Sequence, residues 1–301
     1  MRMLECILIA NDCYKKYHDS IITPTGITVH STDAAGKVLK RFVQPATGQA
    51  FGLKDGGFDV TAAEMLQILG TNVYGNSWNR PGVQKAVHAM LGQIADGSYA
   101  VCKTLDYKNP CWAGAFGSRG SYDGRIKVDG QTVAGGTLNI QFEMIESPAG
   151  DNDKTHCRKL YELAVEFCVY LCVMFPTIKV NNIVSHKEAN KRGYASAHGD
   201  PESYWSRCGM SYTMDGFRAD VAEALEQKLN PSKPDNPFHD VKESDWFYDD
   251  VMWAVENGIT NGTTETTFSP DHPCTRAQAV AFLRRQQEET IRRVTEMLNE
   301  K

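Results

Sequence analysis

The strongest constraint on the fold is a long helical pattern between Asp153 and Phe175. Apolar residues recur there at spacings of three and four, which is typical of a helix with one buried face. They are Leu160, Leu163, Ala164, Phe167, Cys168, Leu171 and Cys172. Pro176 ends this helix, and the β-branched run 178–184 predicts a strand directly after it. A second amphipathic helix is expected at Asp215–Leu229. Strands that alternate with helices indicate an α/β fold with a mixed central β-sheet flanked by helices.

A short proline-rich stretch divides the chain. Asn230–Pro237 has three prolines in eight residues, which disfavours helix and strand and is typical of a semi-rigid linker. With 301 residues, the chain is long enough for two domains. We therefore predict a first domain at 1–229, a linker at 230–237, a small all-helical unit at 238–285 and a C-terminal helix at 286–301.

The composition argues against several functional classes. A net charge of −5 gives no support to nucleic-acid binding, which relies on basic surface. No apolar run approaches the roughly 18 residues of a membrane helix. The N-terminus, MRMLECILIANDC, lacks the core and cleavage site of a signal peptide, so we expect synthesis in the cytoplasm. The nine cysteines form no CxxC pair, so we expect reduced core cysteines rather than a cysteine-based zinc knuckle.

Three side chains that can bind a metal lie in one glycine-containing segment after the predicted strand: His186, His198 and Asp200. A distant histidine, His30, ends another short β-branched run and could complete the set. Two imidazoles and a carboxylate are the ligands of an open zinc site that leaves one position for water. His30 could instead be a satisfied core histidine, and His198 could replace His186 as a ligand.

Glu143 lies in a strand-like alternation at 138–145. A carboxylate inside an apolar strand is costly unless it is paired or functional. Burial raises the pKa of such a group, which suits proton transfer near neutral pH. The alternative is a surface glutamate on a half-exposed strand, and the strand pattern alone does not choose between the two.

The order of several motifs resembles a known family. They are ITVHST at 27–32, LKRFVQP at 39–45, IQFEM at 140–144, His186 followed by KRGYAS at 191–196 and AHGDP at 197–201, and DGFRADV at 215–221. Together they resemble the zinc-dependent N-acetylmuramoyl-L-alanine amidases, whose superfamily also contains the peptidoglycan-recognition proteins. Within that group the motifs are similar to those of endolysins from phages and prophages of Gram-positive bacteria.

The resemblance implies a peptidoglycan hydrolase that cleaves the bond between N-acetylmuramic acid and L-alanine. It implies that His30, His186 and Asp200 bind zinc and that Glu143 is the general base. His198 stands where relatives often have lysine, so we expect it to support the transition state.

Three further residues are candidates for substrate contact. His88 lies on the first arm of a β-hairpin predicted at 83–105, where the family often has a histidine or tyrosine near the substrate. Trp78 and Trp112 are expected to line the groove that would bind the glycan and peptide of the substrate. Relatives commonly have histidine directly after the tryptophan that Trp112 matches. This chain has alanine at that position, so we assign it none of the contribution that the histidine ring makes in the relatives.

Two glycine-containing stretches are expected near this groove. Residues 43–78 are predicted to be irregular surface loops, and the insert 118–136 is predicted to form a hairpin that flanks the cleft.

Residues 238–285 resemble one S-layer homology (SLH) repeat nearly from end to end. By analogy, such repeats hold anionic secondary cell-wall polymers, and Arg276 in TRAQ would grip a carboxylate or phosphate. Alternatively, Arg276 only decorates a helix N-terminus. Such repeats usually occur in threes, so we expect the C-terminal units to associate between chains, most simply as a trimer.

The sequence thus predicts an endolysin-like or autolysin-like hydrolase of peptidoglycan, with no nucleic-acid partner and no membrane insertion. It would be made in the cytoplasm and reach the bacterial wall after release. One rival is a protein that grips peptidoglycan without cutting it, which the presence of all three ligands and Glu143 disfavours. The other is a cysteine hydrolase, disfavoured because no cysteine lies in a glycine-rich turn from strand to helix.

Overall fold

The computed structural model describes residues 1–32, 36, 38–46, 49, 51–53, 58–113, 127–128, 131–132, 138–147, 152–193, 195–230 and 235–299. It divides into a first unit, Met1–Leu229, and a second unit, Asn230–Lys301. Residues 231–234 of the predicted linker and most of the insert 118–136 lie outside the described residues.

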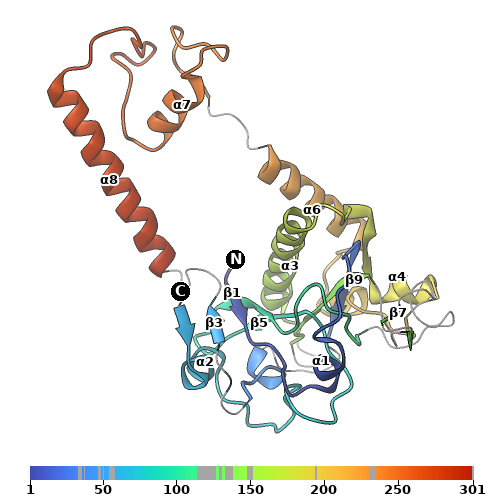
Figure 1. The fold of residues 1–301 in the computed structure, drawn as a ribbon. Helices are drawn as coiled ribbons and strands as arrows, with labels where there is room; N and C mark the ends of the chain where they lie inside the picture. The colour runs from blue at the N-terminus through green and yellow to red at the C-terminus, as the bar shows by residue number, and fades with distance from the viewer. Residues whose placement is uncertain are drawn as a thin grey trace. The chain divides into compact units, whose positions relative to one another are not determined.

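The first unit is built on a six-stranded sheet with the order β1-β6-β5-β9-β2-β10 (Figure 1). Neighbouring strands are parallel except for the antiparallel β5–β6 hairpin, so the predicted mixed sheet is confirmed. The strands are β1 (Met3–Glu5), β2 (Gly26–Ser31), β5 (Ala89–Gln93), β6 (Tyr99–Lys103), β9 (Asn139–Met144) and β10 (Ile183–Ser185). The hairpin starts later than predicted, because the backbone N–H of Ala86 bonds to the carbonyl of Trp112 and not to β6.

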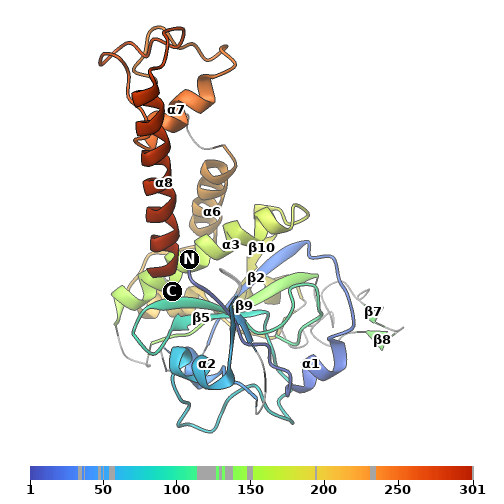
Figure 2. The same ribbon diagram turned by 60° about the vertical axis from the view of Figure 1, so that its left-hand side comes forward.

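Two long helices, α3 (Lys154–Met174) and α6 (Met214–Leu229), cover one face of this sheet (Figures 1 and 2). Asp153 begins α3 by accepting a hydrogen bond from the backbone N–H of His156 at 2.9 Å. The stripe predicted for α3 is buried against the sheet. Both predicted helices are therefore confirmed, with ends within one residue of those expected.

The alternation of side chains along the strands separates the two faces of the sheet. Val29 of β2 and Phe142 of β9 have no exposed surface and pack in the same cluster as α3. Because successive side chains of a strand point to opposite faces, His30 and Glu143 point to the other side. These two residues are direct neighbours in the β2–β9 register.

Short elements cover that other face: α1 (Asp12–Tyr17), η1 (Leu39–Arg41) and α2 (Ala62–Leu69) (Figure 2). The prediction of irregular loops at 43–78 is wrong for α2. Thr61 and Glu64 form a capping box there, and the apolar side of the helix is buried.

Two small antiparallel pairs lie outside the main sheet. They are β3 (Phe51–Leu53) with β4 (Phe58–Val60), and β7 (Lys127–Val128) with β8 (Gln131–Thr132). The second pair is the described part of the hairpin predicted within the insert 118–136.

The segment between α3 and α6 differs from the prediction. Only the end of the run 178–184 is strand, because a 3-10 turn, η2 (Val180–Asn182), precedes β10. Ser185 then forms a capping box with Glu188, so that α4 (His186–Lys191) begins directly after β10, within the glycine-containing segment that follows the predicted strand. A second short helix, α5 (Glu202–Arg207), follows.

The second unit contains α7 (Tyr248–Glu256) and α8 (Arg276–Asn299), and the helix predicted at 286–301 is part of α8. Thr275 accepts a hydrogen bond from the backbone of Gln278 at 3.2 Å and so caps α8. A small core consists of Phe238, Val241, Tyr248, Val251 and Met252. In neither unit does a described helix have the length and apolar character needed to cross a membrane.

Candidate metal centre

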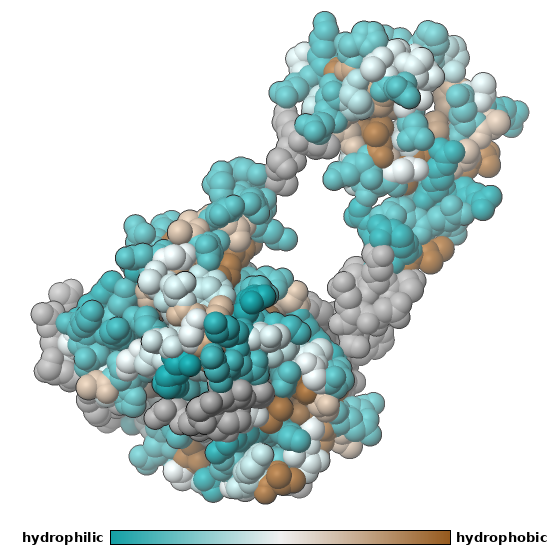
Figure 3. Space-filling model, turned by 180° about the vertical axis from the view of Figure 1, so that it is seen from behind, coloured by the Kyte–Doolittle hydropathy of each residue, from teal (hydrophilic) through white to brown (hydrophobic). Residues whose placement is uncertain are grey.

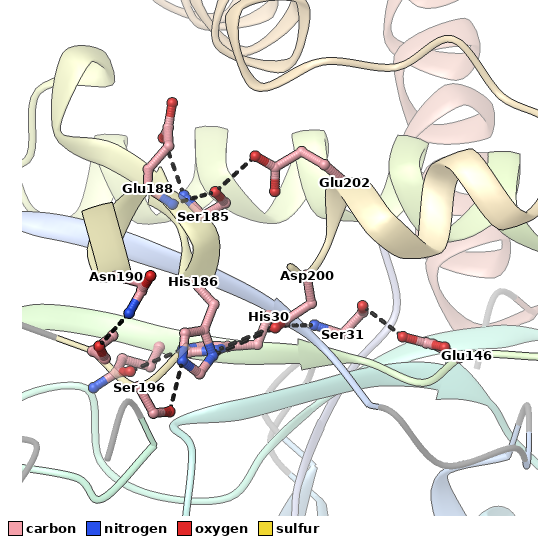
Figure 4. Close-up of polar contacts among 12 residues, drawn as sticks. His30, Ser31, Glu146, Ser185, His186, Glu188, Asn190, Ser196, Asp200 and Glu202 are labelled. Carbon is pink, nitrogen blue, oxygen red and sulfur yellow. Dashed lines mark hydrogen bonds and ion pairs between the residues drawn. The ribbon is translucent and has the colours of Figure 1, made fainter. Parts of the chain in front are cut away.

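Three elements of the first unit bring His30, His186 and Asp200 together (Figure 4). His30 is near the end of β2, His186 is the first residue of α4, and Asp200 directly precedes the turn into α5. Nδ1 of His30 is 3.0 Å from Nδ1 of His186 and 3.6 Å from Oδ2 of Asp200. Nδ1 of His186 is 3.5 Å from Oδ1 of Asp200. The three side chains are buried and could hold a metal ion.

The spacing of these three donors fits zinc. Zinc binds nitrogen and oxygen at about 2.0–2.1 Å in a tetrahedral arrangement, which places neighbouring donors about 3.3 Å apart. The two histidine Nδ1 atoms are 3.0 Å apart, and each lies 3.5–3.6 Å from an oxygen of Asp200, His186 from Oδ1 and His30 from Oδ2, so the separations are close to that value. Two imidazoles and one carboxylate leave the fourth tetrahedral position open.

The second ring nitrogen of each histidine is held by a neighbouring side chain. Nε2 of His30 is 2.9 Å from Oε1 of Gln141, and Nε2 of His186 is 3.2 Å from Oγ of Ser196. Because an amide oxygen only accepts, His30 carries its proton on Nε2 and leaves the Nδ1 lone pair for a metal.

The charges of the three groups suit a metal ion. Burial and the nearby His30 lower the pKa of His186 to about 4, so this ring is neutral near pH 7. Although burial works in the opposite direction, the nearby His30 and His186 rings and the backbone N–H of Ser31 lower the pKa of Asp200. Burial also opposes a charged ring at His30, but Asp200 and Glu143 together raise the pKa of His30. A metal ion therefore competes with a proton at His30.

Glu143 lies beside this cluster on β9, two residues after Gln141 and on the same face of the strand. One carboxylate oxygen, Oε2, is buried and has no hydrogen-bond partner in the described part of the chain. Burial raises the pKa of Glu143 to about 8, and the negative charges of Asp200 and Glu146 act in the same direction, whereas His30 opposes them. A carboxyl group in this position can take up and release a proton near neutral pH.

A chain of contacts fixes Asp200. Ser31 donates its backbone N–H to Oδ2 of Asp200 at 3.1 Å and its hydroxyl to Oε1 of Glu146 at 2.7 Å (Figure 4). Glu146 is buried and forms an ion pair with Arg207 at the end of α5. Asp200 and α5 are therefore both tied to the ends of β2 and β9.

A second network fixes the helix that carries His186. Arg218 of α6 donates two hydrogen bonds to the carboxylate of Glu188, at 2.9 and 3.0 Å, and a third to the carbonyl of Ile183. Ser185, the cap of α4, donates its hydroxyl to Glu202 at 3.1 Å (Figure 4). The start of α4 is thus held from α5, α6 and its own first turn.

The other predicted site residues lie in different surroundings. The ring centroid of His198 is 4.7 Å from that of His186; His198 is exposed and is not one of the three clustered donors. His88 has no exposed surface, so its predicted substrate contact finds no support in this position. Arg276 is exposed at the first turn of α8.

The two predicted groove tryptophans pack against basic side chains. Trp78 is nearly buried, with the Lys85 ammonium 5.0 Å from its ring centroid. Trp112 is half-buried and lies edge-on to Tyr17, with Lys16 at 5.5 Å. Neither arrangement tests a contact with substrate.

Comparison with known proteins identifies part of the second unit. Residues 237–280 match the family model of the S-layer homology domain. This segment is an SLH domain. Over 67 residues, or 22% of the chain, the sequence is 37% identical to the surface-layer 125 kDa protein of Lysinibacillus sphaericus. The chain spans only 6% of the length of that relative.

Several solved structures are similar in fold to the chain. A point mutant of PlyL has 13% identity and a TM-score of 0.40, and covers 74% of this chain and 99% of its own. The catalytic domain of XlyA has 17% identity and a TM-score of 0.42, with coverage of 73% and 99%. The Staphylococcus aureus hydrolase AmiA in complex with its ligand has 12% identity and a TM-score of 0.46, with coverage of 76% and 85%.

Proposed function

We propose that the first unit is a zinc-dependent N-acetylmuramoyl-L-alanine amidase that cleaves bacterial peptidoglycan. The observation that carries this proposal is the placement of Glu143 next to the cluster of His30, His186 and Asp200, with a carboxylate oxygen that has no partner among the described residues. A cluster of this composition with an adjacent general base is the arrangement expected for hydrolysis by a metal-activated water. The motifs that resemble the amidase family include all four of these residues.

In this proposal, His30, His186 and Asp200 hold zinc, which when bound polarises the scissile carbonyl and lowers the pKa of water. Glu143 takes the proton of the attacking water and passes it to the leaving nitrogen of L-alanine. Its pKa of about 8 suits both steps, because the group exchanges a proton readily near neutral pH. His198 supports the negative charge that develops on the carbonyl oxygen.

The SLH domain would keep the enzyme on its substrate. Arg276 is exposed and could bind the carboxylates or phosphates of a secondary cell-wall polymer. Trp78 and Trp112 would contact the glycan and peptide. The enzyme would be made in the cytoplasm and act on the wall after release, as an endolysin or an autolysin.

A thiol-based hydrolase is not favoured by the cysteines. Eight of the nine are buried, and only Cys274, in the second unit, is exposed. Burial raises the pKa of Cys13 and Cys102 to about 12, so neither is a thiolate near neutral pH.

The test is mass spectrometry of purified Gram-positive peptidoglycan after incubation with the protein, with and without a zinc chelator. We expect free stem peptides with an N-terminal L-alanine, lost on chelation and restored by zinc. Intact wall material that retains the protein would instead indicate a peptidoglycan-binding protein without activity. A Glu143→Gln variant that still releases these peptides at the normal rate would remove Glu143 from the mechanism.

A further inference from the structure

The second unit carries an exposed apolar stripe along α8. Its four apolar residues, Val280, Leu283, Ile291 and Val294, are between 49% and 66% exposed. Gln287 lies between them on the same side of the helix and is counted as the fifth residue of the stripe. In Figure 3, separate brown apolar patches are visible among the mostly teal side chains of the unit that contains α7 and α8. Large apolar side chains at a regular spacing on one helix call for a partner.

The described part of the second unit does not provide that partner. An α-helix turns by about 100° per residue, so the five stripe residues fall within an arc of about 80°. The contacts of α8 with its own unit are made from the opposite side: Arg285 donates to the carbonyl of Ile259 at 3.1 Å, and Arg293 donates to the side chain of Asn257. The midpoint between these two arginines lies about 160° around the helix axis from the centre of the stripe.

The geometry of the stripe is that of a helix–helix seam. Val280 and Ile291 are 11 residues apart, as are Leu283 and Val294. A repeat of 11 residues comes close to three whole helical turns, so the stripe runs nearly parallel to the helix axis. A narrow stripe of this kind is typical of helices that pack on one another, whereas helices that lie on membranes have broad apolar faces.

We propose that copies of this chain associate through α8, with the stripe of one copy packed against the same stripe of another. The border of the stripe is self-complementary: Arg284 and Glu288 lie beside it, 2.8 Å apart and both exposed. In an antiparallel arrangement, Arg284 of one copy can pair with Glu288 of the other. An anionic wall polymer does not match apolar side chains, and the glutamate disfavours an anionic membrane.

This association does not depend on the proposed hydrolysis or on polymer binding. It would join two or three SLH domains in one particle, so that binding of one domain to the wall raises the effective concentration of the others. The seam from Val280 to Val294 is about 21 Å long, since a helix rises 1.5 Å per residue. A seam this short buries few side chains, so we expect association at micromolar protein concentration.

The first test is sedimentation equilibrium of the full chain from 1 to 100 µM. We expect a mass that rises to that of a dimer or trimer, and a monomer mass for a variant with glutamine at Val280, Leu283, Ile291 and Val294. Glutamine is a good helix former, so circular dichroism should show that α8 is retained. Trp246→Gln is the matched control, because Trp246 is 89% exposed in the same unit but lies outside α8.

A monomer at 100 µM, or an oligomer that the four glutamines do not dissociate, would overturn the proposal. A second measurement places the contact. In a Cys274→Ser background, a Gln287→Cys variant should form a disulfide between chains under mild oxidation by oxidised glutathione, which takes up the two electrons. Arg292→Cys, about 140° from the stripe centre, should not. Equal cross-linking of both variants would show that the stripe is not the contact.

Discussion

Replacement of His88 by glutamine is expected to remove a large part of the acid sensitivity of the first unit. His88 has no exposed surface; its Nε2 lies 2.8 Å from the carbonyl of Asn109, and its Nδ1 accepts the N–H of Gln141 at 2.9 Å. Burial lowers the pKa of His88 from 6.5 to about 4. The folded chain therefore keeps this ring neutral, whereas the unfolded chain takes up a proton below about pH 6.5.

The sign and size of the effect follow from this difference. The contribution of neutral His88 to stability is fully present above pH 6.5 and is lost as the pH falls towards 4. At about 1.36 kcal/mol per pKa unit, the difference between the pKa of His88 in the unfolded and the folded chain corresponds to about 3 kcal/mol of stability. About 2 kcal/mol of this is lost between pH 8 and pH 5. At pH 8, His88→Gln should be the less stable protein, because glutamine replaces only one of the two hydrogen bonds.

The assay is urea unfolding of both proteins at pH 8, 6.5 and 5, with chelator present throughout so that metal loading does not vary. The second unit contributes the same transition to both proteins and cancels in the comparison. We expect the stability difference between wild type and His88→Gln to shrink by about 2 kcal/mol from pH 8 to pH 5. His18→Gln, at a half-exposed histidine, is the control and should follow wild type. A difference that stays constant with pH would refute the reasoning.

Three other changes test the site and the SLH domain. Glu143→Gln should lower the rate of stem-peptide release by about 10²–10⁴ while binding to peptidoglycan persists; loss of binding as well would point to a folding defect. Gln141→Leu frees Nε2 of His30 and should weaken zinc binding by about 10–100-fold, measured by competition with a chromophoric chelator; unchanged affinity would contradict the role of Gln141. Arg276→Gln should reduce co-sedimentation with cell walls but leave hydrolysis of soluble fragments unchanged, and normal co-sedimentation would assign polymer binding to other residues.

Features that depend on spacing along one element could be predicted from the sequence. The period of three and four in 153–175 predicts α3, and the alternation in β9 places Glu143 on a sheet face. The same alternation places Gln141 next to Glu143, so the residue that holds His30 was within reach of sequence reasoning. Helix α2 was missed because it has only eight residues, although Thr61 and Glu64 have the spacing of a capping box.

Features that depend on contacts between distant segments could not be predicted. Ser31 and Asp200 are 169 positions apart, and their hydrogen bond follows only from the order of β9, β2 and β10 in the sheet. The ion pair between Glu146 and Arg207 gives no local signal, because charged residues near strand and helix ends are common. His88 is a further example: its strand position predicts neither that its ring is buried nor that both nitrogens contact the backbone.

Ser31 explains how Asp200, on an irregular segment, can be held as firmly as a residue on a strand. It is the last residue of β2, so its backbone is fixed by pairing with β9, and its N–H points at Asp200. Its hydroxyl is bonded to Glu146, whose second oxygen pairs with Arg207. A change at any one of these four residues would remove one hydrogen bond or ion pair from a buried polar group of another. The position of Asp200 is therefore coupled both to the sheet and to α5. A small displacement of either element is resisted by the contacts among Ser31, Glu146, Asp200 and Arg207.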